Sequence, residues 1–256
     1  MNEEKTTVIS LEQVDFSYTE EPVLEKVNLK ILDREMIGIV GPNGGGKTTL
    51  LRLILGLLQP TSGTIQVFGK PPEQISHLLG YVPQHMQFDK RFPASVLEVV
   101  LMGQAGRAGF GRLPKQIITA AKKSLDAVDL LQYEKRSFAG LSGGQRQRVL
   151  IARGLAGKPK MLLFDEPTAN VDSNAGEKLY EILDQLNKKM TILVVSHDIG
   201  FVHHHITSVV CVNHQVLVHP TSELAGHNII DLYGHDISLI RHDHRFSKEG
   251  HFCSSS

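Results

Sequence analysis

The stretch GPNGGGKTTL at residues 41–50 has the composition of a phosphate-binding loop, with four glycines and one proline in its first six positions. A polyphosphate needs backbone N–H groups at near contact distance, and larger side chains would block that approach. Lys47 adds a positive charge, the Thr48 hydroxyl can ligate Mg²⁺, and Thr49 can add one phosphate contact. The alternative is a tight strand-to-helix turn without a ligand. The stretch predicts a nucleoside triphosphate site formed by Gly41, Pro42, Asn43, Gly44, Gly45, Gly46, Lys47, Thr48 and Thr49.

A second glycine-bearing helix start lies in the stretch LSGGQ at residues 141–145. Ser142 is placed as an N-cap, with Gly143 and Gly144 behind it, so the free amides of this helix also suit a phosphate. One nucleotide rarely needs two such helix ends from the same chain. The alternative is an isolated serine-capped helix with no ligand.

Two carboxylates end the apolar run MLLFDEP at residues 161–167. A hard cation between phosphates takes oxygen ligands, and Asp165 can supply them. Glu166 is the next residue, so strand alternation directs it away from Asp165, where it can polarise an attacking water as general base. A solvated acidic turn is the alternative. Beside the glycine loop, the pair predicts hydrolysis of the triphosphate.

Taken together, LSGGQ, the following RQRVLIARGLAGKP and MLLFDEP resemble the ATP-binding-cassette (ABC) ATPases. The resemblance implies two cassettes that sandwich two ATP molecules, each between one chain's glycine loop and the other chain's LSGGQ. It therefore implies a homodimer across two ATP sites, or a pair with a close relative, with ATP and Mg²⁺ as cofactors. In ANVD, Asn170 stands where glycine is common in this branch. The residues expected to act in trans are Ser142, Gly143, Gly144, Gln145 and Asp172.

Three further positions match motifs of this family. His197 in VVSHD resembles the switch histidine beside the γ-phosphate, and Gln84 in YVPQ resembles the glutamine that touches Mg²⁺ and water. Tyr18 resembles the aromatic platform that stacks on adenine, with a core tyrosine on a strand as the alternative. The resemblance assigns catalysis to Glu166, His197, Gln84 and Lys47, and Mg²⁺ binding to Thr48, Gln84 and Asp165.

The stretch YVPQHMQFDKRFPASVLEVVLMG resembles the branch of the family that serves zinc, manganese and iron uptake. In that branch an acidic residue, an FP pair and a helix follow the glutamine; here these are Asp89, Phe92, Pro93 and residues 96–103. In the family this region receives the coupling helix of a permease. The resemblance implies an importer ATPase that works with integral membrane permease subunits and, indirectly, with a solute-binding protein.

Other functions compete with metal import. An importer ATPase for a siderophore, haem or another small solute, and a soluble non-transport ABC ATPase, stay open as alternatives. A small-molecule P-loop kinase has no use for LSGGQ. A scaffold that binds ATP without turnover has no use for Glu166.

The elements that must position these residues alternate between strands and helices. Apolar β-rich runs lie at 36–40, 161–164 and 191–195, and helical patterns lie at 48–58 and 174–190. This alternation predicts an α/β fold whose core is a mainly parallel sheet covered on both faces. The family resemblance implies that this fold is a P-loop ABC ATPase domain. Strand patterns at 6–18 and 22–32 predict an N-terminal antiparallel β subdomain.

Helical patterns dominate from Gln84 to about residue 159 and predict an inserted helical subdomain at about 85–159. Within it, the segment GRAGFGRLP at 106–114 is expected to be a loop. The predicted organisation is a single ABC ATPase domain over residues 1–225, followed by a His-rich extension at 226–256 that is expected to be flexible.

Composition sets the remaining expectations. Equal numbers of acidic and basic residues give no bias toward nucleic acid, so none is expected as a partner. No apolar run approaches the ~20 residues that span a bilayer, and the start of the chain does not resemble a signal peptide. With two cysteines, a reducing compartment is expected. The chain is therefore predicted to be peripheral, on the cytoplasmic face of the inner (plasma) membrane.

Histidines are concentrated late in the chain, where eleven of the 13 lie at or after residue 197. Imidazole is a common Zn²⁺ ligand, yet no C-x-x-C or H-x-x-x-H pair fixes a coordination geometry. Solvated or packed histidines are therefore favoured over a regulatory metal site.

Overall fold

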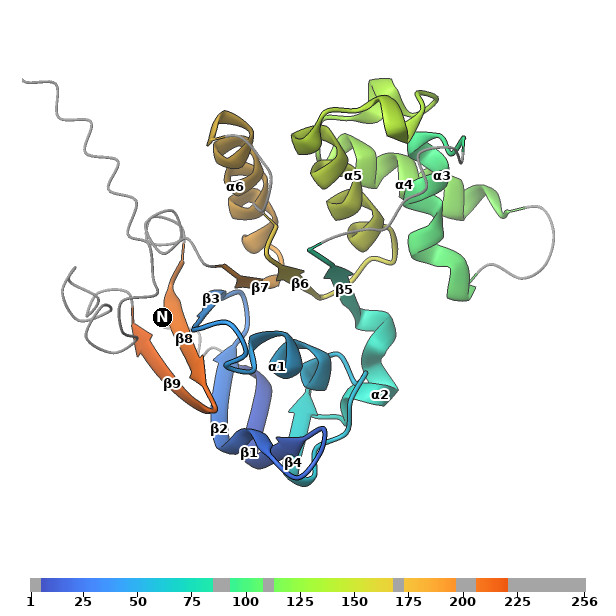
Figure 1. Ribbon diagram of the computed structural model, residues 1–256. Helices are drawn as coiled ribbons and strands as arrows, with labels where there is room; N and C mark the ends of the chain where they lie inside the picture. The colour runs from blue at the N-terminus through green and yellow to red at the C-terminus, as the bar shows by residue number, and fades with distance from the viewer. Residues whose placement is uncertain (1–5, 85–92, 108–112, 168–172, 197–205, 221–256) are drawn as a thin grey trace, which may run out of the picture.

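The computed structural model describes residues 6–84, 93–107, 113–167, 173–196 and 206–220 (Figure 1). The strands are β1 (Thr7–Ser17), β2 (Pro22–Leu32), β3 (Met36–Val40), β4 (Ser62–Val67), β5 (Leu79–Val82), β6 (Met161–Asp165), β7 (Thr191–Val195), β8 (Ser208–Asn213) and β9 (Gln215–Pro220). The α-helices are α1 (Lys47–Ile54), α2 (Pro72–Ile75), α3 (Val96–Leu101), α4 (Lys115–Asp126), α5 (Gly143–Ala156) and α6 (Ser173–Asn187). The 3-10 helices are η1 (Ser76–Leu78), η2 (Met102–Arg107), η3 (Leu131–Tyr133) and η4 (Phe138–Gly140). In these ranges no helix has both the length and the apolar character needed to cross a bilayer.

A six-stranded sheet has the order β5-β6-β7-β3-β8-β9. Neighbours from β5 to β8 run parallel, and β9 closes the edge antiparallel to β8. Every residue of β3, β6 and β7 is buried, as in strands that are covered on both faces. The predicted mainly parallel sheet is confirmed, whereas the β8–β9 hairpin is an addition that the sequence patterns did not predict.

A three-stranded antiparallel sheet, in the order β2-β1-β4, forms the predicted N-terminal β subdomain. Along β2, buried Val27, Leu29 and Ile31 alternate with exposed residues, which is the pattern of a sheet with one wet face. The buried face packs toward β3 and α1 in one continuous apolar cluster.

The large sheet separates two apolar cores. Leu162 and Phe164 of β6 belong to the core under α3, α4, α5 and α6, whereas Met161 and Leu163 belong to the core shared with α1 and the small sheet. Figure 1 shows the same layers, with α5 and α6 on one side of the large sheet and α1 on the other. The two helices whose starts suit a phosphate, α1 and α5, therefore lie on opposite faces of this sheet.

Helix α1 is shorter than the apolar pattern at 48–58 predicted. It ends at Ile54, and Gly56 follows in the left-handed region at φ 71°. The N–H of Leu57 then turns back to the carbonyl of Arg52 at 2.9 Å, which closes the helix end. A glycine that adopts positive φ at low cost thus stops the helix although the next residues are leucines.

Helices α3, α4 and α5 lie in the region predicted to be a helical insertion. Their facing side chains share one core, and capping boxes start both α3, at Ser95, and α5, at Ser142. The predicted loop at 106–114 begins later than expected because η2 continues to Arg107, and residues 108–112 lie outside the described ranges. The division into a domain at 1–225 and an extension at 226–256 stays a prediction, since residues 221–256 are not described.

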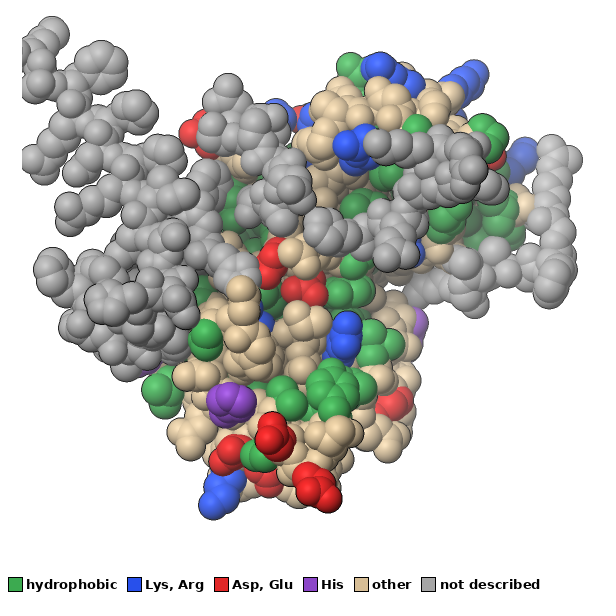
Figure 2. Space-filling model, viewed as in Figure 1, with side chains coloured by type: hydrophobic (Ala, Val, Ile, Leu, Met, Phe, Trp, Pro, Cys, Tyr) green, Lys and Arg blue, Asp and Glu red, His purple; other side chains and the backbone are tan. Residues whose placement is uncertain are grey.

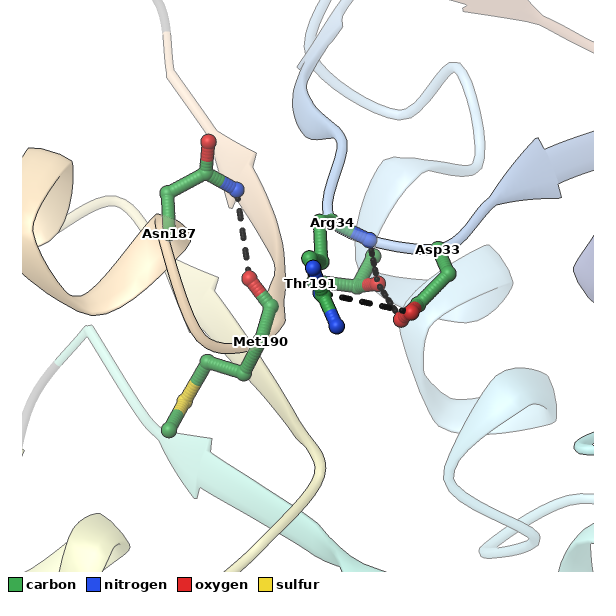
Figure 3. A network of polar contacts seen from close by, with 5 residues as sticks. All are labelled: Asp33, Arg34, Asn187, Met190 and Thr191. Atoms are coloured by element: carbon green, nitrogen blue, oxygen red, sulfur yellow. Dashed lines mark hydrogen bonds and ion pairs between the residues drawn. The ribbon is translucent and has the colours of Figure 1, made fainter. Parts of the chain in front are cut away.

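A polar network ties the two sheets together where β3 and β7 begin (Figure 3). The N–H of Arg34 donates to Thr191 Oγ1 at 2.9 Å, and the Thr191 hydroxyl lies 3.5 Å from Asp33 Oδ1. The Arg34 guanidinium lies 3.6 Å from the other Asp33 oxygen, and the Asn187 amide donates to the carbonyl of Met190 at 3.2 Å. Thr191 is fully buried, so the network satisfies a hydroxyl that would otherwise be costly to bury.

Candidate functional site

The glycine loop joins the end of β3 to the start of α1. Gly41, Gly44 and Gly46 all adopt positive φ, at 149°, 80° and 102°. A Cβ at Gly41 would lie 2.0 Å from the carbonyl oxygen of Val212, and one at Gly46 would lie 2.8 Å from Leu24 Cδ2. A Cβ at Gly44 would meet no atom within 4 Å. The protein's own packing therefore requires Gly41 and Gly46, which the sequence pattern alone does not reveal, and Gly44 faces open space.

Lys47, the first residue of α1, is only 7% exposed. Its Nζ donates to the carbonyls of Gly41 and Pro42, at 2.8 Å each. Burial lowers the pKa of Lys47, and the nearby carboxylates of Glu166 and Asp165 act in the opposite direction. The loop thus holds the ammonium group against its own carbonyls, near enough to Glu166 and Asp165 for their charges to act on it.

Thr48 and Asp165, the predicted cation ligands, converge from α1 and the end of β6. Thr48 Oγ1 lies 3.4 Å from both carboxylate oxygens of Asp165, and the Tyr81 hydroxyl donates to Asp165 Oδ2 at 3.3 Å. Burial raises the pKa of Asp165, and the adjacent Glu166 charge adds to this; the contacts from Tyr81 and Thr48 and the charge of Arg52 lower it. The two oxygen-bearing side chains therefore face one another at a desolvated position.

Tyr81 is a residue of the site that the sequence reasoning missed. Its strand, β5, pairs in parallel register with β6, so that Tyr81 lies opposite Leu163, two residues before Asp165. Burial raises the pKa of Tyr81 to about 12, and the Asp165 charge adds to the effect, so the hydroxyl is a proton donor at neutral pH. Its position three residues before Gln84 in YVPQ was the available signal.

Glu166 and Gln84, the predicted base and hinge residues, are in direct contact. The Gln84 amide donates to Glu166 Oε2, which links the segment that leads into the helical region with the end of β6. Glu166 itself has φ 49°, and its N–H donates to the carbonyl of Val195 on β7 at 3.0 Å. Strand alternation does not extend to Glu166, because β6 ends at Asp165, so the expected direction of its side chain stays a prediction. A non-glycine residue held in the left-handed region is a strained conformation of the kind that clusters at functional sites.

Tyr18 is held beside the start of α1. Its ring meets Phe16 edge-on, with centroids 4.8 Å apart and planes at 88°, and its hydroxyl lies 3.4 Å from Thr49 Oγ1. The side chain is 55% exposed, which does not fit the alternative of a core tyrosine. An exposed aromatic face fixed next to a phosphate-type loop can take a stacked base.

The start of α5 has the geometry that LSGGQ predicted. Ser142 is the N-cap, and its hydroxyl accepts from the N–H of Gln145 at 3.3 Å. The Gln145 side chain accepts in return from the N–H of Ser142 at 3.0 Å. Since Ser142 is exposed, the positive end of a 14-residue helix reaches the surface of the helical region.

Several predicted residues lie outside the described ranges, namely Asp89, Phe92, Asn170, Asp172 and His197. Strand β7 ends two residues before His197, and the N–H of Ser196 donates to the carbonyl of Ile39 on β3 at 3.1 Å. The roles predicted for the five residues outside the described ranges stay predictions.

The sheet order, the loop after β3 and the acids after β6 define a P-loop nucleotide-binding protein with an additional helix start suited to phosphate. The glycine loop, with Thr48 directly behind it, follows the carboxyl end of β3. Asp165 and Glu166 lie at the carboxyl end of β6. Ligands bind at this edge of open α/β sheets. The class of protein follows from this geometry.

Comparison with known proteins narrows the class. The profile of the family described as ABC transporter matches residues 24–169. A probable metal transport system ATP-binding protein of Chlamydia muridarum is 46% identical over 198 residues, which cover 76% of this chain and 83% of that protein. The manganese transport system ATP-binding protein MntB of Bacillus subtilis is 42% identical over 193 residues, which cover 75% and 77%.

A solved structure matches the fold as well. The ATP-binding cassette MJ0796, determined as a dimer in a post-hydrolysis state bound to ADP and Pi, superposes with a TM-score of 0.70 at 29% identity and covers 83% of this chain and 98% of that one. The chain belongs to the ABC transporter family and is an ABC ATPase that binds nucleotide. ABC ATPase domains form dimers and work with membrane permease subunits.

Proposed function

We propose that this chain is one of two copies that close on two ATP molecules, hydrolyse them and so drive uptake of a divalent transition metal ion through separate permease subunits. The observation that carries the proposal is the presence of two phosphate-type helix starts, at Lys47 and at Ser142, on a chain whose relatives are named as subunits of metal transport systems. The chain acts at the cytoplasmic face of the membrane, with a solute-binding protein as an indirect partner.

The residues around Asp165 fit a bound Mg²⁺. A hard cation prefers hydroxyl and carboxylate oxygens, and Thr48 and Asp165 present these to one another at 3.4 Å in a desolvated position. Thr48, Asp165 and Gln84 would hold the ion. When bound, Mg²⁺ neutralises charge that develops on the phosphate oxygens.

The remaining residues bind, orient and deprotonate. Tyr18 stacks on adenine, the amides of residues 41–46 surround the phosphates, and Lys47 moves from its two loop carbonyls to the phosphate oxygens. Glu166, fixed by its N–H contact to Val195 and by Gln84, accepts a proton from the attacking water. His197 contacts the γ-phosphate and the attacking water.

The start of α5 serves the nucleotide of the other copy. In this chain α1 and α5 lie on opposite faces of the large sheet, so two separate helix starts are available to two nucleotides. A two-fold pair brings Ser142, Gly143, Gly144 and Gln145 of one copy to the P-loop of the other, with Asp172 beside them. The dimeric form of the cassette MJ0796 supports this arrangement.

The transported ion never touches this chain, so the choice of metal is supported by the relatives and by the family resemblance. Manganese is proposed because the relative MntB is named as part of a manganese transport system. Zinc and iron are proposed because residues 81–103 resemble the branch of the family that serves their uptake. A siderophore or haem importer and a soluble ABC ATPase are the competing functions.

Radiolabelled manganese, zinc and iron uptake in cells that carry the wild-type chain or Glu166→Gln tests the function. We expect one of the metals to accumulate with the wild-type chain and to stay near background with Glu166→Gln. Glu35→Gln, a change at the other end of the sheet, is the matched control and should leave uptake intact. Equal accumulation of all three metals in all strains would contradict metal import.

A further inference from the structure

Charge is segregated along this chain although its formal net charge is zero. The acidic segment, residues 7–25, contains five carboxylates and no lysine or arginine. The basic segment, residues 135–164, contains seven lysines and arginines and no aspartate or glutamate. The acidic segment includes Tyr18, and the basic segment includes the helix start at Ser142. Each segment thus flanks one half of an ATP site that two copies would share.

The acidic segment presents its charge to solvent around the turn between β1 and β2. The exposed carboxylates are those of Glu12, Glu20, Glu21 and Glu25. Glu20 and Glu21 come two and three residues after Tyr18. Asp15 is different because its carboxylate already accepts from the Ser62 hydroxyl at 2.5 Å and from the N–H of Lys26 at 2.7 Å. The charge available to a partner is therefore concentrated next to the adenine platform.

The basic segment presents its charge around the start of α5. Lys135 and Arg136 are exposed and precede the short η4 turn that leads to Ser142, and Arg146 lies in the first turns of the helix. The Arg136 guanidinium donates to the carbonyl of Gly140 at 3.2 Å and lies 5.6 Å from the centroid of the Tyr133 ring. This cation is thereby held close to the loop that carries LSGGQ.

One face of the molecule carries side chains of both charges, which gather at different places. Figure 2 shows acidic side chains gathered at the foot of the view, where the β1–β2 sheet lies, and basic side chains along the top, over the helical region. A two-fold axis that lies in this face and runs across the line from foot to top brings the foot of one molecule to the top of the other. Each dimer then contains the acidic-to-basic contact twice.

We propose that the acidic segment of one copy and the basic segment of the other steer and stabilise the ATP-bound dimer. The proposal rests on the dimer of the proposed function and adds the surface that aligns it. Complementary patches raise the association rate, by about tenfold or more at low salt, and they suppress the wrong orientation. Screening over about 8 Å at physiological ionic strength weakens the effect.

A second copy fits the basic segment better than an anionic membrane does. Lipid headgroups would attract Lys135 and Arg136, but a membrane that covers the same face would also meet Glu20 and Glu21 and be repelled by them. A second copy offers a partner of the correct sign to both segments. The observed arrangement therefore favours the dimer, and lipid binding is an outcome that the test must separate.

Charge reversal in the intact chain tests the proposal. One variant carries Glu20→Lys with Glu21→Lys, and the other carries Lys135→Glu with Arg136→Glu. Sedimentation measures the dimer dissociation constant with Mg²⁺ and a non-hydrolysable ATP analogue, at about 50 mM and about 500 mM salt. We expect each variant alone to dimerise about tenfold more weakly than wild type at low salt, and nearly as wild type at high salt.

An equimolar mixture of the two variants gives the decisive result. In the mixed dimer, one contact pairs the two reversed segments and the other pairs two unaltered segments, so both are again complementary. Dimerisation in the mixture should therefore return to the wild-type value. Glu177→Lys with Glu181→Lys on α6 carries the same change in net charge outside both segments, and mixing it with the second variant should restore nothing.

Further controls keep the test interpretable. Lys135→Glu alone preserves the Arg136 contacts and should weaken dimerisation by a smaller factor. Thermal melts check that each variant folds.

Reversed variants that dimerise like wild type, or a mixture without recovery, would overturn the proposal. Loss of binding to phosphatidylserine vesicles by the second variant, without a change in dimerisation, would assign the basic segment to lipid and overturn it too. A wild-type chain that never dimerises with nucleotide would overturn the proposed function itself.

Discussion

The two ends of the six-stranded sheet use similar polar side chains in different ways. Where β3 and β7 begin, Thr191 accepts from the N–H of Arg34 at 2.9 Å and approaches Asp33, so neighbouring turns satisfy one another. Where β6 ends, the contacts that buried Asp165 receives from the described residues are 3.3 and 3.4 Å long, and burial raises its pKa. Polar groups where β3 and β7 begin therefore hydrogen-bond to one another, whereas the carboxylate at the end of β6 is placed to bind a ligand.

Glu166→Gln is expected to have the largest effect at the site end. Turnover should fall by about 10²- to 10⁴-fold, since an amide cannot accept the proton of the attacking water, while ATP affinity is kept. Steady-state ATPase assays and equilibrium binding measure the two quantities. Glu35→Gln, whose side chain accepts from the N–H of Leu32 at 3.0 Å at the opposite end, is the control and should keep turnover. Retained hydrolysis in Glu166→Gln would assign the base to another group.

Lys47→Ala should weaken ATP binding by about a hundredfold, because charge-assisted hydrogen bonds are worth about 3 kcal/mol. Its ammonium is held by the carbonyls of Gly41 and Pro42, within the loop itself. Equilibrium dialysis checks the affinity, with Lys30→Ala on exposed β2 as the matched variant. Normal affinity in Lys47→Ala would contradict the assignment of the loop.

Thr191→Val tests the other end of the sheet. It removes the acceptor of the Arg34 N–H and should lower the free energy of unfolding by about 1–3 kcal/mol without changing turnover of the folded enzyme. Urea titration measures the loss, with exposed Thr64→Val as the control. If Thr191→Val cut turnover and left stability unchanged, the two ends would not differ as described.

Cys211 gives the smallest effect and concerns alkaline pH. Burial raises the pKa of this thiol from 9.0 to about 12, so the folded state keeps its proton in a range where the unfolded chain releases it. Its contribution to stability is therefore complete below pH 9.0 and is lost as the pH rises toward 12. Between these values the wild-type free energy of unfolding should fall more steeply than that of Cys211→Ala, by about 1 kcal/mol per pH unit. Parallel slopes would contradict the shift.

Much of this organisation could be predicted from the sequence because it is recorded in local patterns. The runs at 36–40, 161–164 and 191–195 became β3, β6 and β7, and the capping serine of LSGGQ starts α5 as expected. Thr48 and Asp165, which the glycine-loop motif and the family resemblance assigned to one cation, lie 3.4 Å apart.

Contacts between distant segments could not be predicted in the same way. Tyr81 reaches Asp165 only because β5 pairs beside β6, and Gly41 is constrained by Val212 on an unpredicted strand. The left-handed conformation of Glu166 depends on its bond to β7. Each of these features depends on strand order, which a local pattern does not contain.

The central claim is that two copies complete each ATP site between them, and a mixing experiment tests it most directly. Lys47→Ala removes one half of each site and Ser142→Arg blocks the other, so each variant alone should be inactive. In an equimolar mixture, about half of the dimers carry one intact site, so turnover should recover to about a quarter of the wild-type value. A mixture of exchanging, folded variants that stays inactive would contradict the claim.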